Sequence, residues 1–140
     1  KGEVVQAHPD FQLVVSYNPG YQSRAKDMKT STRQRFAALD FDYPSMEVEA
    51  GIVAHETGVA LDTAVRLVRI AHQSRALKGR GLDEGMSTRL LVYAGLLIAS
   101  GLAARESCDM ALTHALTDDP DMARTLRDLV EAQFGAETGA

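Results

Sequence analysis

The segment Ser16–Phe36 reads SYNPGYQSRAKDMKTSTRQRF and separates two stretches with the composition of β-strands. The preceding stretch, Phe11–Ser16, is short, apolar and β-branched, and the Asn-Pro-Gly that follows it is typical of a turn, so we expect a buried strand there. The following stretch, residues 37–43 (AALDFDY), alternates apolar and acidic side chains and ends at Pro44, which predicts a second strand. The polar residues between them, 22–35, predict a short helix that ends at a pair of arginines.

The order strand, helix, strand predicts the last part of a parallel α/β sheet. A fully apolar strand is typical of a parallel sheet that is covered on both faces, and two strands alone do not make a stable sheet. The other strands would have to precede Lys1. Because the chain begins with Lys1 rather than Met, we expect a processed, trimmed or partly represented polypeptide.

The rest of the chain has helical patterns, which predict a bundle of four or five helices. The longest uncharged run, Leu90–Ala104, would span about 22 Å as a helix, too short for a bilayer core of about 30 Å. It therefore predicts a buried helix and no membrane insertion. The expected N-caps are Ser45, Asp62, Ser87 and Asp119, the expected end of the first helix is Gly58, and a further helix is expected over residues 103–117.

The composition limits the classes of protein to which the chain could belong. It has 140 residues, a net charge of −4 and a sequence pI of about 5.5, and this acidic balance argues against a nucleic-acid partner. Arginine without a basic excess suggests a few individually placed guanidinium groups. The single cysteine, Cys108, excludes an internal disulfide framework and suits a reducing compartment, so we expect a cytoplasmic protein. The four histidines show no paired metal-ligand spacing, which argues against a zinc site.

Three residues beside the predicted strands are candidates for chemistry. Asn18 follows the first strand, where functional residues of open α/β sheets are found, and its amide could orient a water or contact a phosphate; a simple turn residue is the alternative. Arg33 and Arg35 precede the second strand and could each offer a planar fork to a phosphate. Solvated arginines, or a salt bridge to Asp40 or Asp42, are the alternatives.

Arg89 is a fourth candidate because it falls in the first turn of the predicted apolar helix. The helix dipole disfavours cations at this position. A cation beside the free amide groups of a helix amino end is, however, an arrangement that suits a phosphate. An exposed arginine that is tolerated at small cost is the alternative.

Taken in order, VVSYNPGYQ, KTSTRQRF, FDYP and GMSTRLLVYAGLLIASG resemble the second half of AAA+ ATPases of the MoxR branch, in the CbbQ/NorQ group. The resemblance runs from about His8 to Gly101. It implies the C-terminal part of a P-loop NTPase. Residues 1–44 would supply the last strands of the parallel AAA+ sheet, and residues 45–140 would form the helical lid and the C-terminal helices.

The resemblance also assigns roles to the candidate residues. Asn18 matches the sensor 1 asparagine and Arg89 matches the sensor 2 arginine, so both would contact the nucleotide of their own subunit. Arg35 matches the arginine finger, which acts at the neighbouring subunit's nucleotide, and Arg33 would lie beside it. The chain departs from the family in lacking the Gly-x-x-x-x-Gly-Lys-Ser/Thr loop. The groups that hold ATP and Mg²⁺ are therefore expected outside this stretch, and the 140 residues alone are expected to be inactive.

The family resemblance implies a homo-hexameric ATPase that acts mechanically on a target protein. On overall likeness we expect Rubisco activation. Because nothing in the sequence looks like a substrate-recognition loop, we also expect a separate adaptor, which in the family is a protein with a von Willebrand factor A domain. Maturation of nitric oxide reductase is the alternative within the family. A non-catalytic helical interaction module is favoured by the missing phosphate loop and opposed by the coexistence of Asn18, Arg35 and Arg89. A DNA-binding helical domain is opposed by the acidic balance.

Overall fold

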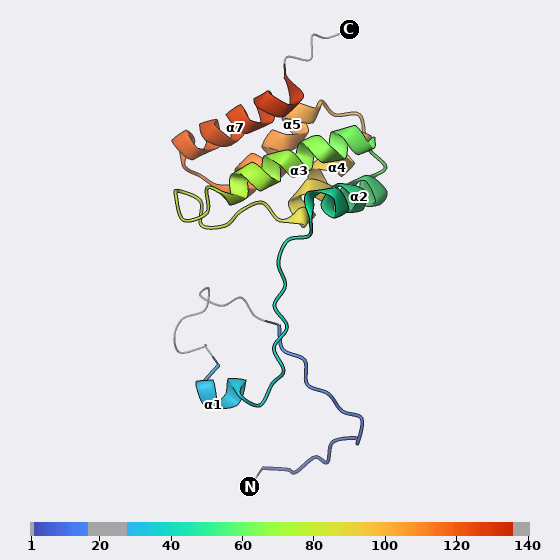
Figure 1. Ribbon diagram of the computed structural model, residues 1–140, viewed down its shortest axis with the longest axis vertical. Helices are drawn as coiled ribbons and strands as arrows, with labels where there is room; N and C mark the ends of the chain where they lie inside the picture. The colour runs from blue at the N-terminus through green and yellow to red at the C-terminus, as the bar shows by residue number, and fades with distance from the viewer. Residues whose placement is uncertain (1, 17–27, 136–140) are drawn as a thin grey trace. The chain divides into compact units, whose positions relative to one another are not determined.

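The computed structural model describes residues 2–16 and 28–135, and the chain divides into two units, Lys1–Asp40 and Phe41–Ala140. Over the described residues of the first unit the backbone is irregular except for helix α1 (Thr30–Arg33) (Figure 1). This helix confirms the expected short helix at Arg33, while residues 22–27 lie outside the described part of the chain.

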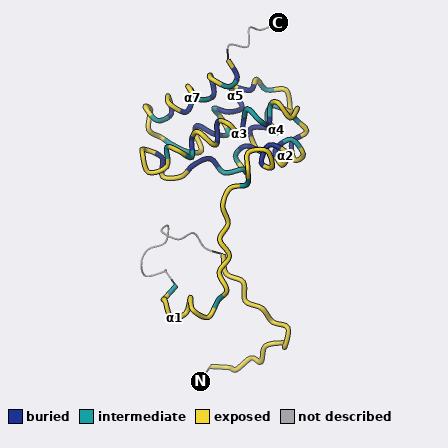
Figure 2. Tube along the Cα trace, in the orientation of Figure 1, coloured by how far each residue is buried: buried dark blue, intermediate teal, exposed yellow. Residues whose placement is uncertain are grey.

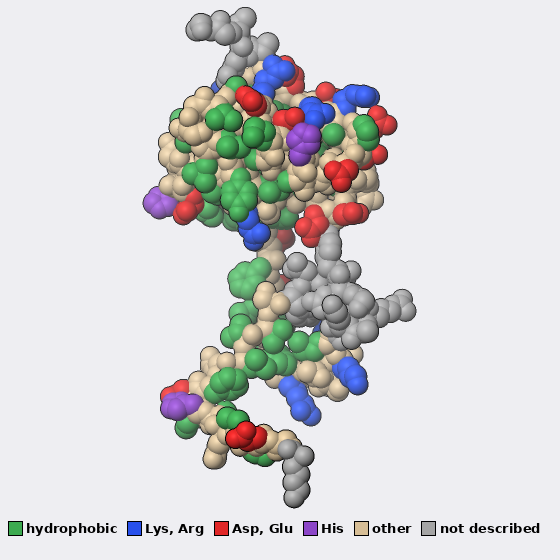
Figure 3. Space-filling model, turned by 180° about the vertical axis from the view of Figure 1, so that it is seen from behind, with side chains coloured by type: hydrophobic (Ala, Val, Ile, Leu, Met, Phe, Trp, Pro, Cys, Tyr) green, Lys and Arg blue, Asp and Glu red, His purple; other side chains and the backbone are tan. Residues whose placement is uncertain are grey.

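The two predicted strands are wrong, because neither residues 11–16 nor residues 37–43 form a strand in the structure. A strand is stable only where another strand pairs with its backbone groups, and the described residues supply no such partner. The apolar side chains expected to be buried are exposed instead: Phe11 is 64% exposed and Val14 is 87% exposed. Figure 3 shows hydrophobic side chains on the surface along this unit. The described fold is therefore helical, without the expected sheet.

The second unit is a bundle of helices around one apolar core (Figures 1 and 2). Helices α2, α3 and α4 pack against one another, and α7 packs against α3 and α5. The largest buried apolar side chains include Leu67, Ile70, Leu91, Leu112 and Leu126. The elements are α2 (Met46–Thr57), α3 (Leu61–Arg75), α4 (Thr88–Ala99), α5 (Ala104–Cys108), the π-helix η1 (Asp109–Thr113), α6 (His114–Leu116) and α7 (Pro120–Phe134).

The ends of α2 and α7 follow the predicted capping chemistry. The Ser45 hydroxyl accepts a hydrogen bond from the Val48 amide at 3.4 Å, and Gly58 ends α2 with a φ of 76°, which glycine adopts without strain. The Asp119 carboxylate accepts from the Met122 amide at 2.8 Å, and Pro120 occupies the first helical position.

Two other predictions about the helices are wrong. Asp62 does not cap α3, because the helix begins at Leu61, with Ala60 at the N-cap position, and Asp62 in the first turn instead pairs with Arg66 at 2.8 Å. The expected continuous helix over residues 103–117 is divided by η1, in which the backbone takes one turn of π-helix. Over residues 2–16 and 28–135, no helix has both the length and the apolar composition needed to cross a bilayer.

Candidate functional site at the amino end of helix α4

Arg89 lies in the first turn of α4, as the sequence predicts, and its side chain is exposed. Ser87 is the residue before the helix, although its side chain makes no capping hydrogen bond. The amides of Thr88 and Arg89 precede the first backbone hydrogen bond of the helix, from the Leu90 amide to the Ser87 carbonyl oxygen, and carry the positive end of the helix dipole. A guanidinium group next to such amides suits an anionic ligand, and phosphate is the anion that its planar fork fits best.

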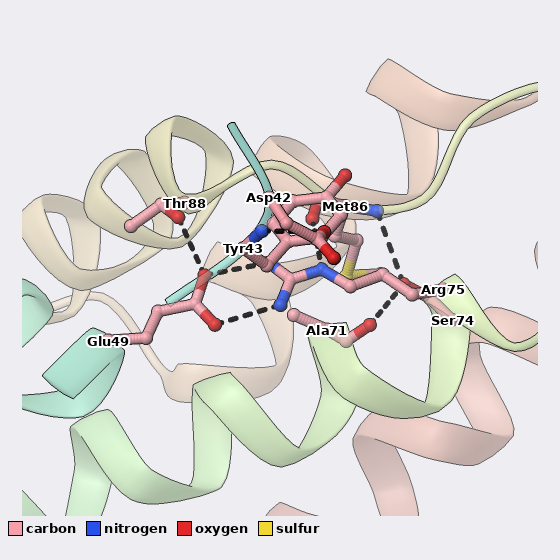
Figure 4. A network of polar contacts seen from close by, with 8 residues as sticks. All are labelled: Asp42, Tyr43, Glu49, Ala71, Ser74, Arg75, Met86 and Thr88. Carbon is pink, nitrogen blue, oxygen red and sulfur yellow. Dashed lines mark hydrogen bonds and ion pairs between the residues drawn. The ribbon is translucent and has the colours of Figure 1, made fainter. Parts of the chain in front are cut away.

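Glu49 of α2 fixes the position of this helix end. The Thr88 hydroxyl, at the residue before Arg89, donates a hydrogen bond to Glu49 Oε1 at 2.6 Å (Figure 4). Glu49 has 0% exposed surface. A buried carboxylate is tolerated only where charged and polar donors compensate for the lost water, so the contacts of Glu49 account for its presence in the core.

Arg75, the last residue of α3, supplies that compensation. Its Nη1 and Nη2 atoms donate to the two carboxylate oxygens of Glu49 at 2.8 Å and 2.7 Å, which is the bidentate geometry that makes such pairs strong. Its Nε atom donates to the carbonyl oxygen of Met86 at 2.9 Å, two residues before Thr88. One guanidinium group therefore joins α2, α3 and the loop that leads into α4.

Two further contacts enclose the Arg75 side chain. The ring of Tyr43, in the segment that leads into α2, lies 3.5 Å from the Arg75 guanidinium carbon, measured to the ring centroid. Figure 4 shows this ring beside the guanidinium. On the loop before α4, Gly85 approaches so closely that a Cβ atom there would lie 2.6 Å from Arg75 Cγ and 2.9 Å from its Cα. Because the nearest backbone cannot give way, this position requires glycine.

Ser74 holds the same loop by a separate contact. Its hydroxyl donates to the Ala71 carbonyl oxygen at 2.8 Å and accepts from the Met86 amide at 3.3 Å. Both backbone groups of Met86 are thus paired with adjacent residues of α3, the amide with Ser74 and the carbonyl with Arg75. The chain is held tightly where it turns from the loop into α4.

The charge state of Glu49 follows from these contacts. Burial by itself would raise the pKa of the Glu49 carboxyl, but hydrogen bonds from Arg75 and Thr88, together with the charges of Arg75 and His72, outweigh burial and hold the pKa below its ordinary value. Glu49 is therefore a carboxylate at neutral pH, as the bidentate pair with Arg75 requires.

Neither Glu49 nor Arg75 is among the site residues predicted from the sequence. A signal was available in α2, whose buried residues are Glu49, Ala50, Val53 and Thr57. Glu49 lies four residues before Val53, on the face that packs inward. A carboxylate on a buried helical face indicates a buried partner, although not which one.

The other predicted site residues lie outside the helical unit that contains Arg89. Arg33 ends α1, Arg35 follows it, and both are exposed. They belong to the first unit, and their role at the neighbouring subunit's nucleotide stays a prediction. Asn18 lies outside the described residues. Over residues 2–16 and 28–135, no group of three or more His, Cys, Asp or Glu side chains could hold a metal ion.

Comparison with known proteins identifies a family model, described as CbbQ/NirQ/NorQ C-terminal, that matches residues 49–133. The matched region begins at Glu49 and includes Arg75, Thr88 and Arg89. The chain is 64% identical to the protein CbbQ of Hydrogenophilus thermoluteolus over 134 residues, which are 96% of this chain and 50% of that protein.

Two further relatives have lower identity. The chain is 49% identical to the protein NorQ of Paracoccus denitrificans over 134 residues, which are 96% of this chain and 50% of the relative. It is 50% identical to the denitrification regulatory protein NirQ of Pseudomonas aeruginosa over 130 residues, which are 93% of this chain and 50% of the relative. The chain therefore spans about half the length of the curated relatives that it matches.

Proposed function

This chain belongs to the CbbQ/NirQ/NorQ family, and we propose that the complete protein is a hexameric AAA+ ATPase that uses ATP hydrolysis to remodel or activate a target enzyme. The observation that carries the proposal is the placement of Arg89. It is an exposed arginine at the amino end of α4, within the matched region, and its helix end is held by a buried network of hydrogen bonds.

The residues at the amino end of α4 fit a nucleotide phosphate. The exposed guanidinium group of Arg89 offers charged donors to a phosphate, and the amides of Thr88 and Arg89 at the start of the helix favour an anion beside it. Arg89 would bind the phosphates of its own subunit's ATP and would couple that binding to the position of the helical unit. Bound Mg²⁺ would supply neutralisation of phosphate charge, and the residues that would hold it are expected outside this stretch.

Arg33, Arg35 and Asn18 complete the proposed machinery. Arg35 would act in trans, stabilising the charge that develops on the γ-phosphate in the neighbouring subunit, with Arg33 beside it at the same interface. Asn18 would orient the attacking water in its own subunit. These assignments rest on the motif resemblance.

For the target, we propose Rubisco. The identity to a CbbQ protein, 64%, exceeds the identities to the NorQ and NirQ proteins, 49% and 50%. The complete ATPase would act with a von Willebrand factor A-domain adaptor as the part that contacts the target.

The test supplies the complete ATPase, its adaptor and ATP to Rubisco that is blocked by a tight sugar-phosphate inhibitor. We expect carboxylation to recover with the unchanged ATPase and to stay blocked with its Arg89→Ala and Arg35→Ala variants. Each variant must first be shown to form hexamers, so that a loss of recovery cannot be due to failed assembly. If carboxylation stays blocked with the unchanged ATPase, Rubisco is not the target.

Maturation of nitric oxide reductase is the second candidate, because the chain is about half identical to a NorQ protein over nearly its whole length. Cells that lack this protein would then fail to produce active nitric oxide reductase. Restoring the protein would restore the reductase activity, whereas restoring the Arg35→Ala variant would not. A normal reductase in cells that lack the protein would exclude this candidate.

A further inference from the structure

We propose that Arg75 is a positioning residue that ties the amino end of α4, and with it Arg89, to the segment Phe41–Ser45 that leads into the helical unit. The inference rests on the proposed function, since Arg89 is the residue through which Arg75 would act. It adds a connection between two places that the family resemblance leaves unrelated: the start of the helical unit and the arginine that faces the phosphate.

The first step of the argument is that every nitrogen atom of the Arg75 guanidinium has a partner. Nη1 and Nη2 donate to Glu49, and Nε donates to the Met86 carbonyl oxygen. The side chain is 13% exposed. A planar group whose three nitrogen atoms are all hydrogen-bonded has one orientation. The residues that contact it are therefore held in fixed positions relative to it.

The second step is that two of these contacts converge on the residues just before Arg89. Met86 is bonded directly to Arg75, and the Thr88 hydroxyl donates to the Glu49 oxygen that also accepts from Arg75 Nη2. A shift of the guanidinium would therefore move two points of the chain within three residues of Arg89. Functional groups need support of this kind, because small displacements from the productive geometry cost much of the binding.

The third step is that the ring of Tyr43 lies over one face of the guanidinium. This ring lies 3.5 Å from the guanidinium carbon, a short stacking distance, although the residue is 45% exposed. Tyr43 lies three residues beyond Asp40, the last residue of the first unit. The segment that leads into the helical unit is thus attached to the same guanidinium that holds the start of α4.

A purely stabilising role is the competing explanation, because breaking a buried ion pair destabilises a fold whatever else the pair does. Substituting Arg75 or Glu49 would not separate the two explanations, since either variant could fail to fold. Tyr43 and Thr88 are better positions for a test. Tyr43 is half-exposed, and the change Thr88→Val removes one hydrogen bond while keeping the shape of the side chain.

The experiment is a double-mutant cycle on nucleotide binding by the complete protein, with ATP affinity measured in the unchanged and the Arg89→Ala backgrounds. With Arg89 present, Tyr43→Leu should weaken ATP binding by about two- to fivefold, the factor that corresponds to one exposed cation–π contact. Tyr43→Phe keeps the ring and should bind like the unchanged protein. In the Arg89→Ala background, Tyr43→Leu should have no further effect.

Thr88→Val should behave like Tyr43→Leu, and Thr88→Ser, which keeps the hydroxyl, should not.

A second measurement needs no nucleotide. Hydrogen exchange at the backbone amides of Leu90 and Leu91, which donate to the Ser87 carbonyl oxygen at the start of α4, should be faster in Tyr43→Leu than in Tyr43→Phe, because the helix end loses part of its support. Exchange in the middle of α7 should be the same in both variants. Unchanged exchange at the start of α4 in Tyr43→Leu would overturn the inference.

The outcomes separate this inference from the proposed function. If the unchanged protein binds no ATP, or if Arg89→Ala binds ATP normally, the proposed role of Arg89 is wrong and the inference falls with it. If Arg89→Ala weakens binding but Tyr43→Leu does not, the inference alone is overturned. Equal losses for Tyr43→Leu in both backgrounds would also overturn it, because Tyr43 would then act independently of Arg89.

Discussion

Among single residues, Glu49 is placed where one substitution should have the largest effect on stability. Its carboxylate is fully buried and accepts three hydrogen bonds, two from Arg75 and one from Thr88. Glu49→Gln would leave the Arg75 charge without its partner, and breaking such a pair costs about 3–5 kcal/mol. We expect urea unfolding of the chain to show a loss of that order.

The matched control for Glu49→Gln is Asp62→Asn. Asp62 also pairs with an arginine, Arg66, at 2.8 Å, but both side chains are exposed. Exposed pairs of this spacing contribute about 0.3–0.5 kcal/mol. Losses of similar size in the two variants would show that burial of the Glu49 pair adds nothing to stability.

The pH dependence of stability tests the same residue in a second way. The folded pKa of Glu49 lies below its ordinary value of 4.5, so the unfolded chain binds the proton more readily. The stabilisation by Glu49 is therefore complete above about pH 4.5 and is lost as the pH falls through the folded pKa. Asp109 contributes with the same sign, because a hydrogen bond from Arg127 holds its pKa low. Glu49→Gln should flatten the rise in unfolding free energy between pH 3 and 5 without abolishing it, as urea titrations at several pH values would measure.

Cys108 should be chemically inert in the folded protein. It is buried at the end of α5, and burial raises the pKa of its thiol to about 12. Since the thiolate is the reactive form, a thiol reagent at pH 8 should label the folded chain far more slowly than the chain in denaturant. Rapid labelling without denaturant would mean that the α5 region opens readily.

At the scale of the elements, two helical glycines should respond in opposite directions to alanine. Gly95 of α4 faces α2, and a Cβ atom there would lie 2.8 Å from Thr57 Cγ2, whereas a Cβ atom at Gly51 of α2 would meet nothing within 4 Å. We expect Gly51→Ala to stabilise the chain by about 0.5–1 kcal/mol through helix propensity. Gly95→Ala should destabilise it by about 1–2 kcal/mol, because overpacking exceeds the same gain in propensity. The difference in thermal unfolding midpoint between the two variants measures the closeness of the contact between α2 and α4.

The elements also mark where prediction from sequence succeeds. The starts of α2 and α7 were predictable because Ser45 and Asp119 satisfy local backbone groups, and such chemistry is local. The two strands could not be predicted from local sequence, because a strand forms only where a partner strand pairs with it. The composition of a segment does not show whether such a partner is present. The π-turn of η1 was not predicted, because residues 103–117 were expected to form one continuous helix.

In the candidate site, too, the feature that depends on local sequence was predictable and the features that depend on distant residues were not. The sequence predicts Arg89 at a helix start, and the structure places it there. The network beneath it could not be predicted, because Glu49, Arg75 and Thr88 are separated by 26 and 39 residues along the chain. Only the packing of three helices brings them together. The residue that would contact a ligand could thus be predicted from a local motif, whereas the residues that support it could not.

At the scale of the whole molecule, the proposed ring makes each nucleotide site depend on two subunits, and Arg35 is the residue that tests this. Arg35→Ala should lower the ATP turnover of the complete protein by about 10³- to 10⁵-fold while nucleotide binding stays nearly intact, because the lost interaction forms only in the transition state.

A variant in which the lysine of the expected phosphate loop is replaced should also be inactive, since its own site cannot hold ATP productively. Mixed hexamers of the two variants should regain partial activity, because some interfaces would then combine an intact Arg35 with an intact nucleotide site. Assembly of every sample into hexamers must be confirmed by its mass in solution. An absence of activity in confirmed mixed hexamers would contradict a role of Arg35 in trans and would assign it to the structure of its own subunit.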